Sequence, residues 1–169
     1  MARIAINGLG RIGRAALRLI LEDDNLDLVA VNDIASPDNI AYLIKYDSVY
    51  GRYGEDVFAK DGNLHVDKNT FKFLSEKDPA KLPWRALDVD VVVEATGAFT
   101  SFAGSKVHLD AGAKRVVITA PAKDEPSAAG VSGATVLMAI NEDQLEKCDI
   151  SSNASCTTNA GSPLMAILH

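Results

Sequence analysis

The sequence has little that would place this protein outside the ordinary globular classes. Its 169 residues include only two cysteines and three histidines, and no apolar run approaches the roughly 18 residues needed to cross a bilayer. Two cysteines are too few for a disulfide scaffold or a zinc site, so we expect no bound metal. The first residues lack an apolar run of signal-peptide length. Together these absences predict a cytoplasmic protein.

An excess of positive charge is also missing. The chain has 23 acidic and 17 basic residues, a formal net charge of −6, and no basic stripe with interleaved aromatic residues. Nucleic acids and anionic membranes both select basic surfaces. We therefore expect neither a nucleic acid nor a membrane as a partner. A hydrophobic content of 47% in a chain of this length is enough for one domain with a real core.

Apolar segments alternate with helical patterns at the start of the chain. Residues 3–7 form a short apolar run that stops at a glycine, and apolar residues then recur at helical spacing over residues 12–20. Residues 28–31 form a second apolar run, typical of a parallel strand buried on both faces. This order predicts a strand, helix and strand joined by a right-handed crossover. Ser36 and Pro37 then predict the start of another helix.

The pattern changes between residues 46 and 73, where short segments separated by turn pairs predict an antiparallel excursion. The α/β rhythm then returns, with predicted strands at residues 89–94, 115–119, 136–140 and 149–152 and predicted helices at residues 101–112 and from Cys156 onward. We therefore predict the α/β class, with a doubly wound, mostly parallel sheet that carries a small antiparallel insert. The last helical pattern has no stop signal, which predicts a truncated chain.

The six residues from Gly8 to Gly13 match the pattern G-x-G-x-x-G, directly after a predicted strand and at the start of a predicted helix. In that context the first glycine makes a tight turn, the second (Gly10) lets the backbone approach a pyrophosphate, and the third lets the helix pack closely on the sheet. Free N–H groups at the helix start attract the anion. The pattern predicts a dinucleotide site.

Asp33 lies 20 residues beyond Gly13, at the end of the second predicted strand. A carboxylate at this place accepts hydrogen bonds from the adenosine ribose and repels a 2′-phosphate, which favours NAD over NADP. Aspartate also ends many strands in ordinary turns. Thr96-Gly97 and Thr119 follow two other predicted strands, and they fit either contacts to the nicotinamide ribose or ordinary loops.

Cys156 opens the last helical pattern, and the polar residues Ser155 and Thr157 flank it. A helix N-terminus favours the reactive thiolate, and neighbouring hydroxyls and N–H groups can hold an anion. A lone cysteine is more often a small buried hydrophobe, a description that suits Cys148 better. Cys156 is therefore our candidate nucleophile.

A base for this nucleophile is hard to find among the three histidines. His65 falls in the antiparallel excursion, and we expect His108 on a solvated helix face. His169 is 13 residues beyond Cys156, more than three helical turns away. A nucleophile without its base again predicts a fragment of a longer protein.

These motifs resemble those of the phosphorylating glyceraldehyde-3-phosphate dehydrogenases. Four segments carry the resemblance in order along the chain, and they are residues 6–14, 45–48, 94–97 and 152–159. The resemblance implies a Rossmann NAD-binding domain over residues 1–152 and the truncated start of an α+β catalytic domain over residues 153–169. It implies NAD-dependent oxidation of glyceraldehyde 3-phosphate with inorganic phosphate, in a protein that is a homotetramer at full length.

The resemblance also assigns residues. Arg11, Ile12, Asp33, Lys77 and Thr119 match positions of NAD contacts. Cys156 matches the nucleophile, and Ser155 and Thr157 match a phosphate position. The chain departs from the family pattern at Ala160, Lys77 and Tyr50, where the family commonly has cysteine, arginine and histidine. The family's catalytic histidine lies beyond His169.

Two other functions remain open at this point. Erythrose 4-phosphate dehydrogenases share these motifs, so the aldehyde is not determined. The chain, which lacks the base, also fits a nucleotide-binding module without catalytic activity.

Overall fold

The computed structural model describes residues 1–168. The strands are β1 (Ala2–Asn7), β2 (Leu26–Asn32), β3 (Tyr46–Asp47), β4 (Gly51–Arg52), β5 (Val57–Lys60), β6 (Asn63–Val66), β7 (Asn69–Leu74), β8 (Val91–Glu94), β9 (Arg115–Ile118), β10 (Gly133–Thr135) and β11 (Ile150–Ser152). The helices are α1 (Arg11–Glu22), α2 (Pro37–Lys45), α3 (Phe102–Asp110), α4 (Pro126–Ala129) and α5 (Cys156–Leu168), with 3₁₀ turns at Pro79–Lys81 and Glu142–Lys147.

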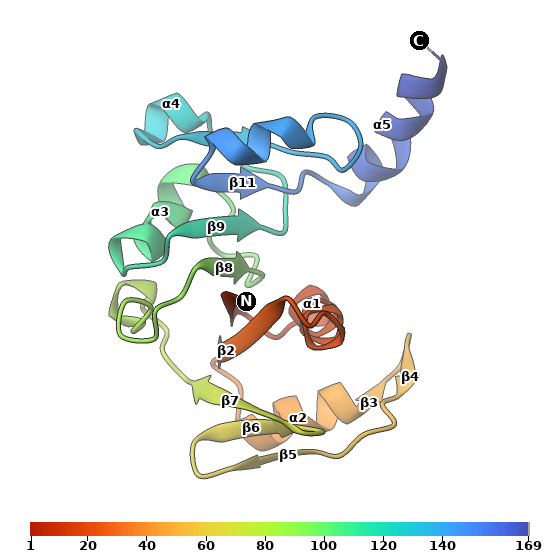
Figure 1. The fold of residues 1–169 in the computed structure, drawn as a ribbon, viewed down its shortest axis with the longest axis vertical. Helices are drawn as coiled ribbons and strands as arrows, with labels where there is room; N and C mark the ends of the chain where they lie inside the picture. Colours follow the sequence, from red (N-terminus) through yellow and green to blue (C-terminus); the bar gives the residue numbers. More distant parts are fainter. Residues whose placement is uncertain (169) are drawn as a thin grey trace.

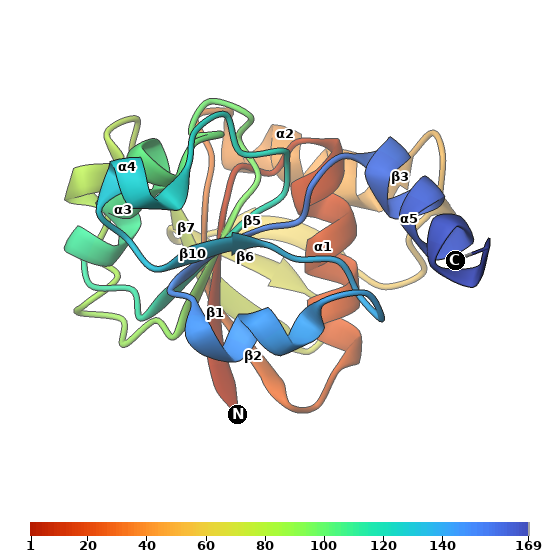
Figure 2. The ribbon, with the colours of Figure 1, turned by 90° about the horizontal axis from the view of Figure 1, so that it is seen from above.

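Residues 1–168 form one nine-stranded sheet in the order β10-β11-β9-β8-β1-β2-β7-β6-β5, with β3 and β4 as a separate hairpin (Figure 1). All strand pairs from β10 to β7 are parallel, and β6 and β5 continue the sheet in antiparallel fashion. The order β7-β2-β1-β8-β9-β11 is the 3-2-1-4-5-6 order of dinucleotide-binding folds. Helix α1 lies on one face of the sheet, and α3 and α4 lie on the other (Figure 2). The predicted class and the doubly wound parallel sheet are confirmed.

The positions of the buried residues explain why β1 forms a strand and α1 a helix that packs on it. In β1, Ile4, Ala5 and Ile6 are all buried, as expected of a central parallel strand covered on both faces. Leu17 and Ile20 of α1 pack on the same core. Helix α2 begins as predicted, because the Ser36 hydroxyl accepts a hydrogen bond from the backbone N–H of Asn39 at 3.3 Å. The unit from β1 to α2 therefore follows from local signals.

Two predicted strands need correction. The antiparallel excursion predicted over residues 46–73 includes most of β7, but β7 pairs in parallel with β2, and only its other edge pairs with the antiparallel β6. The predicted strand at residues 136–140 is wrong, since the strand is Gly133–Thr135. The Asn141 side chain accepts a hydrogen bond from the Leu137 N–H at 2.8 Å and stabilises a turn there, which leaves Met138 73% exposed.

Helix α3 buries two polar residues on the same face as the apolar Phe102. Ser105 and His108 are fully buried, and the expectation of a solvated His108 is wrong. Both polar side chains find hydrogen-bond partners inside the protein, Ser105 donating to the Phe99 carbonyl at 2.8 Å. Burial of a polar group is tolerated when it is hydrogen-bonded in this way.

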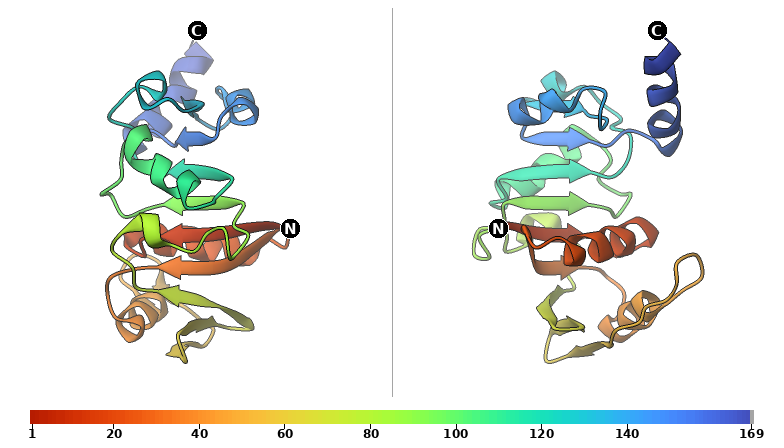
Figure 3. Two further views of the ribbon diagram at one scale, coloured as in Figure 1. Left: turned by 90° about the vertical axis from the view of Figure 1, so that its left-hand side faces the viewer. Right: turned by 45° about the vertical axis from the view of Figure 1, so that its right-hand side comes forward.

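Helix α5 stands apart from the rest of the fold (Figure 3). None of its described residues is buried, and Leu164 and Ile167 are 58% and 81% exposed. No helix within residues 1–168 is long and apolar enough to cross a membrane.

Candidate functional site

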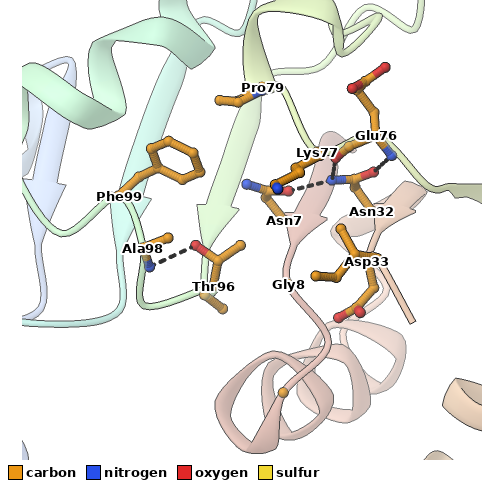
Figure 4. A pocket seen from close by; sticks show the side chains of 13 residues that line it. Asn7, Gly8, Asn32, Asp33, Glu76, Lys77, Pro79, Thr96, Ala98 and Phe99 are labelled. Atoms are coloured by element: carbon orange, nitrogen blue, oxygen red, sulfur yellow. Dashed lines mark hydrogen bonds between the residues drawn. The ribbon is translucent and has the colours of Figure 1, made fainter.

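A cavity of about 400 Å³ opens at the carboxyl ends of the central strands. Its walls come from the ends of β1, β2 and β8 and from the loop after β7 (Figure 4). This is the point where the strand order reverses, and ligands of doubly wound sheets bind there. The lining includes the predicted cofactor residues Gly8, Gly10, Asp33, Lys77 and Thr96. It also includes residues that we did not predict, namely Asn7, Asn32, Ile34, Glu76, Pro79, Ala95, Ala98 and Phe99.

The three glycines of the turn have three different reasons to be glycine. Gly8 has a φ of +95°, and a Cβ on it would lie 2.7 Å from the backbone nitrogen of Thr96. A Cβ on Gly13 would lie 1.9 Å from the carbonyl oxygen of Gly8, so only glycine lets α1 approach the turn. A Cβ on Gly10 would meet no atom within 4 Å, although Gly10 lines the cavity. The space beside Gly10 is therefore open on the side of the cavity.

Helix α1 directs its N-terminus toward this turn. Its N-cap residue is Gly10, which has no side chain to satisfy the first N–H groups. These N–H groups have no partner inside the helix, and the helix dipole favours a negative charge beside them. Arg11 and Ile12 form the exposed first turn, with Ile12 57% exposed. The geometry suits a pyrophosphate.

Asp33 stands beside the glycine turn and has two backbone partners. Its Oδ2 accepts a hydrogen bond from the Leu9 N–H at 2.6 Å, and its Oδ1 accepts one from the Ala35 N–H at 2.8 Å. A carboxylate offers about four acceptor positions, so about two remain for ribose hydroxyls. Asp33 therefore shapes a turn, and it also lines the cavity. The two roles weighed from the sequence are compatible.

The remaining predicted cofactor residues differ in their surroundings. The Thr96 hydroxyl donates to the buried Glu94 carboxylate and accepts from the Ala98 N–H at 3.1 Å. Thr119 is held by two 3.1 Å hydrogen bonds to the Glu94 carbonyl, and it lies outside the residues that line the cavity. Gly97 also lies outside the lining and has a φ of +74°.

Cys156 is the first residue of α5 and is exposed, as predicted. The Ser155 hydroxyl accepts from the Thr158 N–H at 3.0 Å and lies 2.9 Å from the Thr157 hydroxyl. Ala154, just before them, has a φ of +57°, a conformation that costs a non-glycine residue about 1 kcal/mol and recurs at functional sites. Because β11 is parallel to β9, β8 and β1, Cys156 follows the same sheet edge as the cavity.

The structure brings no histidine of residues 1–168 to Cys156. His65 stacks on Phe58 with ring centroids 4.5 Å apart, and His108 is buried against Glu94 and Trp84. His169 lies outside the described residues. Over the same described residues, no group of three or more His, Cys, Asp or Glu side chains has the arrangement of a metal site.

Comparisons with known proteins point to one family. Residues 2–102 match the family model for the NAD binding domain of glyceraldehyde 3-phosphate dehydrogenase. The chain is 47% identical over 167 residues to a glyceraldehyde-3-phosphate dehydrogenase of Mycoplasma pneumoniae, covering 98% of this chain and 48% of the relative. It is 48% identical over 168 residues to that of Chlamydia trachomatis, again covering 98% and 48%.

A third relative, the glyceraldehyde-3-phosphate dehydrogenase of Thermotoga maritima, is 46% identical over 172 residues, which cover all of this chain and 50% of the relative. The chain therefore spans about half the length of the curated relatives it matches.

Proposed function

This chain belongs to the glyceraldehyde-3-phosphate dehydrogenase family, and we propose that it forms the NAD-binding half of an enzyme that oxidises and phosphorylates glyceraldehyde 3-phosphate. The observation that carries the proposal is the pairing, at one sheet edge, of the glycine turn with an exposed cysteine at a helix N-terminus. NAD is the cofactor of this domain.

The residues of the cavity fit that cofactor. The free N–H groups at the start of α1 would hold the pyrophosphate, and the open space beside Gly10 admits it without a clash. Asp33 would accept hydrogen bonds from the adenosine ribose, and its charge would repel a 2′-phosphate. Lys77, Thr96, Gly97 and Thr119 complete the proposed set of cofactor contacts, together with Arg11 and Ile12.

Cys156 supplies the nucleophile of the proposed reaction. Its thiolate would attack the aldehyde carbon and give a thiohemiacetal. NAD, held by the residues of the cavity, would supply the hydride acceptor that oxidation of this intermediate to a thioester requires. Inorganic phosphate then attacks the thioester carbon, which releases 1,3-bisphosphoglycerate and restores the thiolate. Ser155 and Thr157 would hold a phosphate group beside Cys156. The base that assists these steps is not among residues 1–168, so we propose that residues 1–169 alone are inactive.

We also propose the boundary between residues 152 and 153 for the two domains, a cytoplasmic location, and a homotetrameric full-length enzyme whose partners are small molecules and not nucleic acid or membrane. The resemblance and the acidic net charge of −6 support these proposals.

The full-length protein tests the reaction directly. We expect NADH formation from glyceraldehyde 3-phosphate, NAD and phosphate. In Cys156→Ser we expect the rate to fall at least about a thousandfold, because a serine hydroxyl is a much poorer nucleophile than a cysteine thiolate. Cys148→Ser is the matched control and should keep full activity. Absence of NADH formation by the wild type would reject the proposed reaction. Faster turnover of erythrose 4-phosphate would favour the rival substrate.

Asp33→Asn tests the cofactor site in residues 1–169. The change removes the charge, and it keeps an acceptor for only one of the two backbone donors, the Leu9 and Ala35 N–H groups. We expect NAD binding to weaken about tenfold and NADP binding to weaken less, because only NADP gains from the lost repulsion. Isothermal titration calorimetry with both dinucleotides measures the two constants. Asp24→Asn removes a charge at an exposed site and should change neither. An unchanged ratio of the two affinities would contradict the role of Asp33.

A further inference from the structure

A continuous row of buried polar side chains runs from the wall of the cavity, where Asn32 and Asn7 lie, into the protein interior. Neither the resemblance nor the proposed reaction assigns this row a role. The row runs from Asn32 to Asn7, Glu94, His108 and Trp84. Each of these five side chains is at most 4% exposed. It crosses from the end of β2, through the ends of β1 and β8, to helix α3. A buried polar network of this size requires an explanation, because unsatisfied members would be costly.

The Trp84 contact determines the state of His108. An indole N–H can only donate, and Trp84 Nε1 lies 3.0 Å from His108 Nδ1, so this ring nitrogen is the acceptor. The proton of a neutral ring is then on Nε2, which donates to Glu94 Oε2 at 2.9 Å. His108 is therefore a neutral ring that donates a hydrogen bond to the Glu94 carboxylate, on the side away from the cavity.

The Glu94 carboxylate is surrounded by four donors. Its Oε2 accepts from His108 and from the Asn7 side-chain amide at 2.6 Å. Its Oε1 accepts from the backbone N–H of Thr96 at 2.9 Å and from the Thr96 hydroxyl. All four acceptor positions of an ionised carboxylate are thus filled. A protonated carboxyl or an amide at this position would itself carry a hydrogen-bond donor, which would face one of these four donors without an acceptor between them.

The partners of Glu94 are the residues that form the walls of the cavity. Thr96 is the residue whose backbone nitrogen would lie 2.7 Å from a Cβ on Gly8, so Glu94 holds the end of β8 directly against the glycine turn. Asn7 continues the network to Asn32 at 2.7 Å (Figure 4). Asn32 in turn accepts from the Glu76 N–H at 2.8 Å, in the loop that carries Lys77.

We infer that Glu94 is a positioning residue of the NAD site: from beneath the cavity it fixes the ends of β1 and β8, through Asn7 and Thr96, in the spacing that the dinucleotide requires. It does not line the cavity itself. His108 completes the arrangement as the neutral donor that keeps Glu94 in place. The inference rests on the proposed residue contacts of the NAD site.

Glu94→Gln in residues 1–169 is the direct test, because the amide has nearly the same shape and must oppose at least one donor. We expect NAD binding to weaken at least about tenfold. Binding of AMP, which needs mainly the Asp33 side of the cavity, should weaken less than about threefold. Titration calorimetry measures both ligands under conditions where Trp84 fluorescence shows that each variant is folded. Equal losses for the two ligands, or no loss for either, would overturn the inference.

If Glu94→Gln does not fold, two variants of His108 test the same inference. His108→Gln retains a donor for Glu94, and His108→Leu removes it, at a position outside the cavity lining. We expect the leucine variant to bind NAD at least about fivefold more weakly than the glutamine variant, with AMP binding alike in both. Equal NAD binding by the two variants would contradict the inference. If the wild type bound neither ligand, the cofactor site itself would be wrong.

Discussion

The glycine turn after β1 and the cysteine segment after β11 follow strand ends at the same edge of one sheet, yet their surroundings differ. Around the glycine turn, backbone and side chains meet so closely that two of the three glycines have no room for a Cβ. Around Cys156, the side chains are exposed and bond mainly to one another. Within residues 1–168, the glycine turn is therefore tightly packed, whereas the cysteine segment is exposed.

The difference shows which part of the chemistry each segment can perform by itself. A binding site that is held by its own buried network needs nothing further to keep its shape, and the cavity beside Gly8 meets that description. A nucleophile needs a base and protection from water, whereas Cys156 is exposed and neither His65 nor His108 lies beside it. We therefore expect cofactor binding to survive in residues 1–169 and catalysis to require more protein.

Of the changes that compare the glycine turn with the cysteine segment, Gly13→Ala should have the largest effect on the free energy of unfolding. Its Cβ would lie 1.9 Å from the Gly8 carbonyl oxygen, so α1 must move away from the turn. We expect the free energy of unfolding to fall by about 3 kcal/mol or more, measured by urea unfolding with Trp84 fluorescence.

The control for this change lies in α5, where a Cβ on Gly161 would meet no atom within 4 Å. Gly161→Ala should shift the unfolding free energy by less than about 1 kcal/mol, and in the stabilising direction, because alanine favours the helix. Equal stability of the two variants would show that the glycine turn is not as tightly packed as the structure has it.

The rates at which the two cysteines are alkylated provide a further comparison, in which we expect a smaller effect than that of Gly13→Ala. Cys148 is only 6% exposed, and its burial raises the pKa of its thiol. Cys156, at the start of α5, is exposed. With iodoacetamide at neutral pH, we expect Cys156 to react at least about tenfold faster. Peptide mass spectrometry measures both rates, and in concentrated urea the difference should disappear. Equal rates in the folded protein would mean that the two segments are equally accessible.

Much of the fold could be predicted from the sequence because its signals are local. The apolar run before Gly8, the glycine spacing and the Ser36 cap each specify their own segment. The predicted strand at residues 136–140 failed because its apolar pattern competes with the Asn141 turn, whose hydrogen bonds the pattern does not reveal.

The site was only partly predictable. Gly8, Gly10 and Asp33 belong to a spacing pattern with a known mechanism, whereas Glu94 and His108 act through partners far away in the sequence. The His108 prediction failed for that reason, since burial of a histidine depends on a tryptophan 24 residues earlier. One signal was available: Asn7, Asn32 and Glu94 are polar residues that each end an apolar strand.

The hydrogen bond between Asn7 and Glu94 joins residues 87 positions apart. Closing so long a loop costs chain entropy before any contact repays it, so pairings of this kind form slowly. The first strand, turn and helix can assemble early. The cavity is incomplete until β8 pairs with β1, because Ala95 and Thr96, which follow β8, form part of its lining. On a ribosome, a nascent chain would therefore display its glycine signature long before it could retain a dinucleotide.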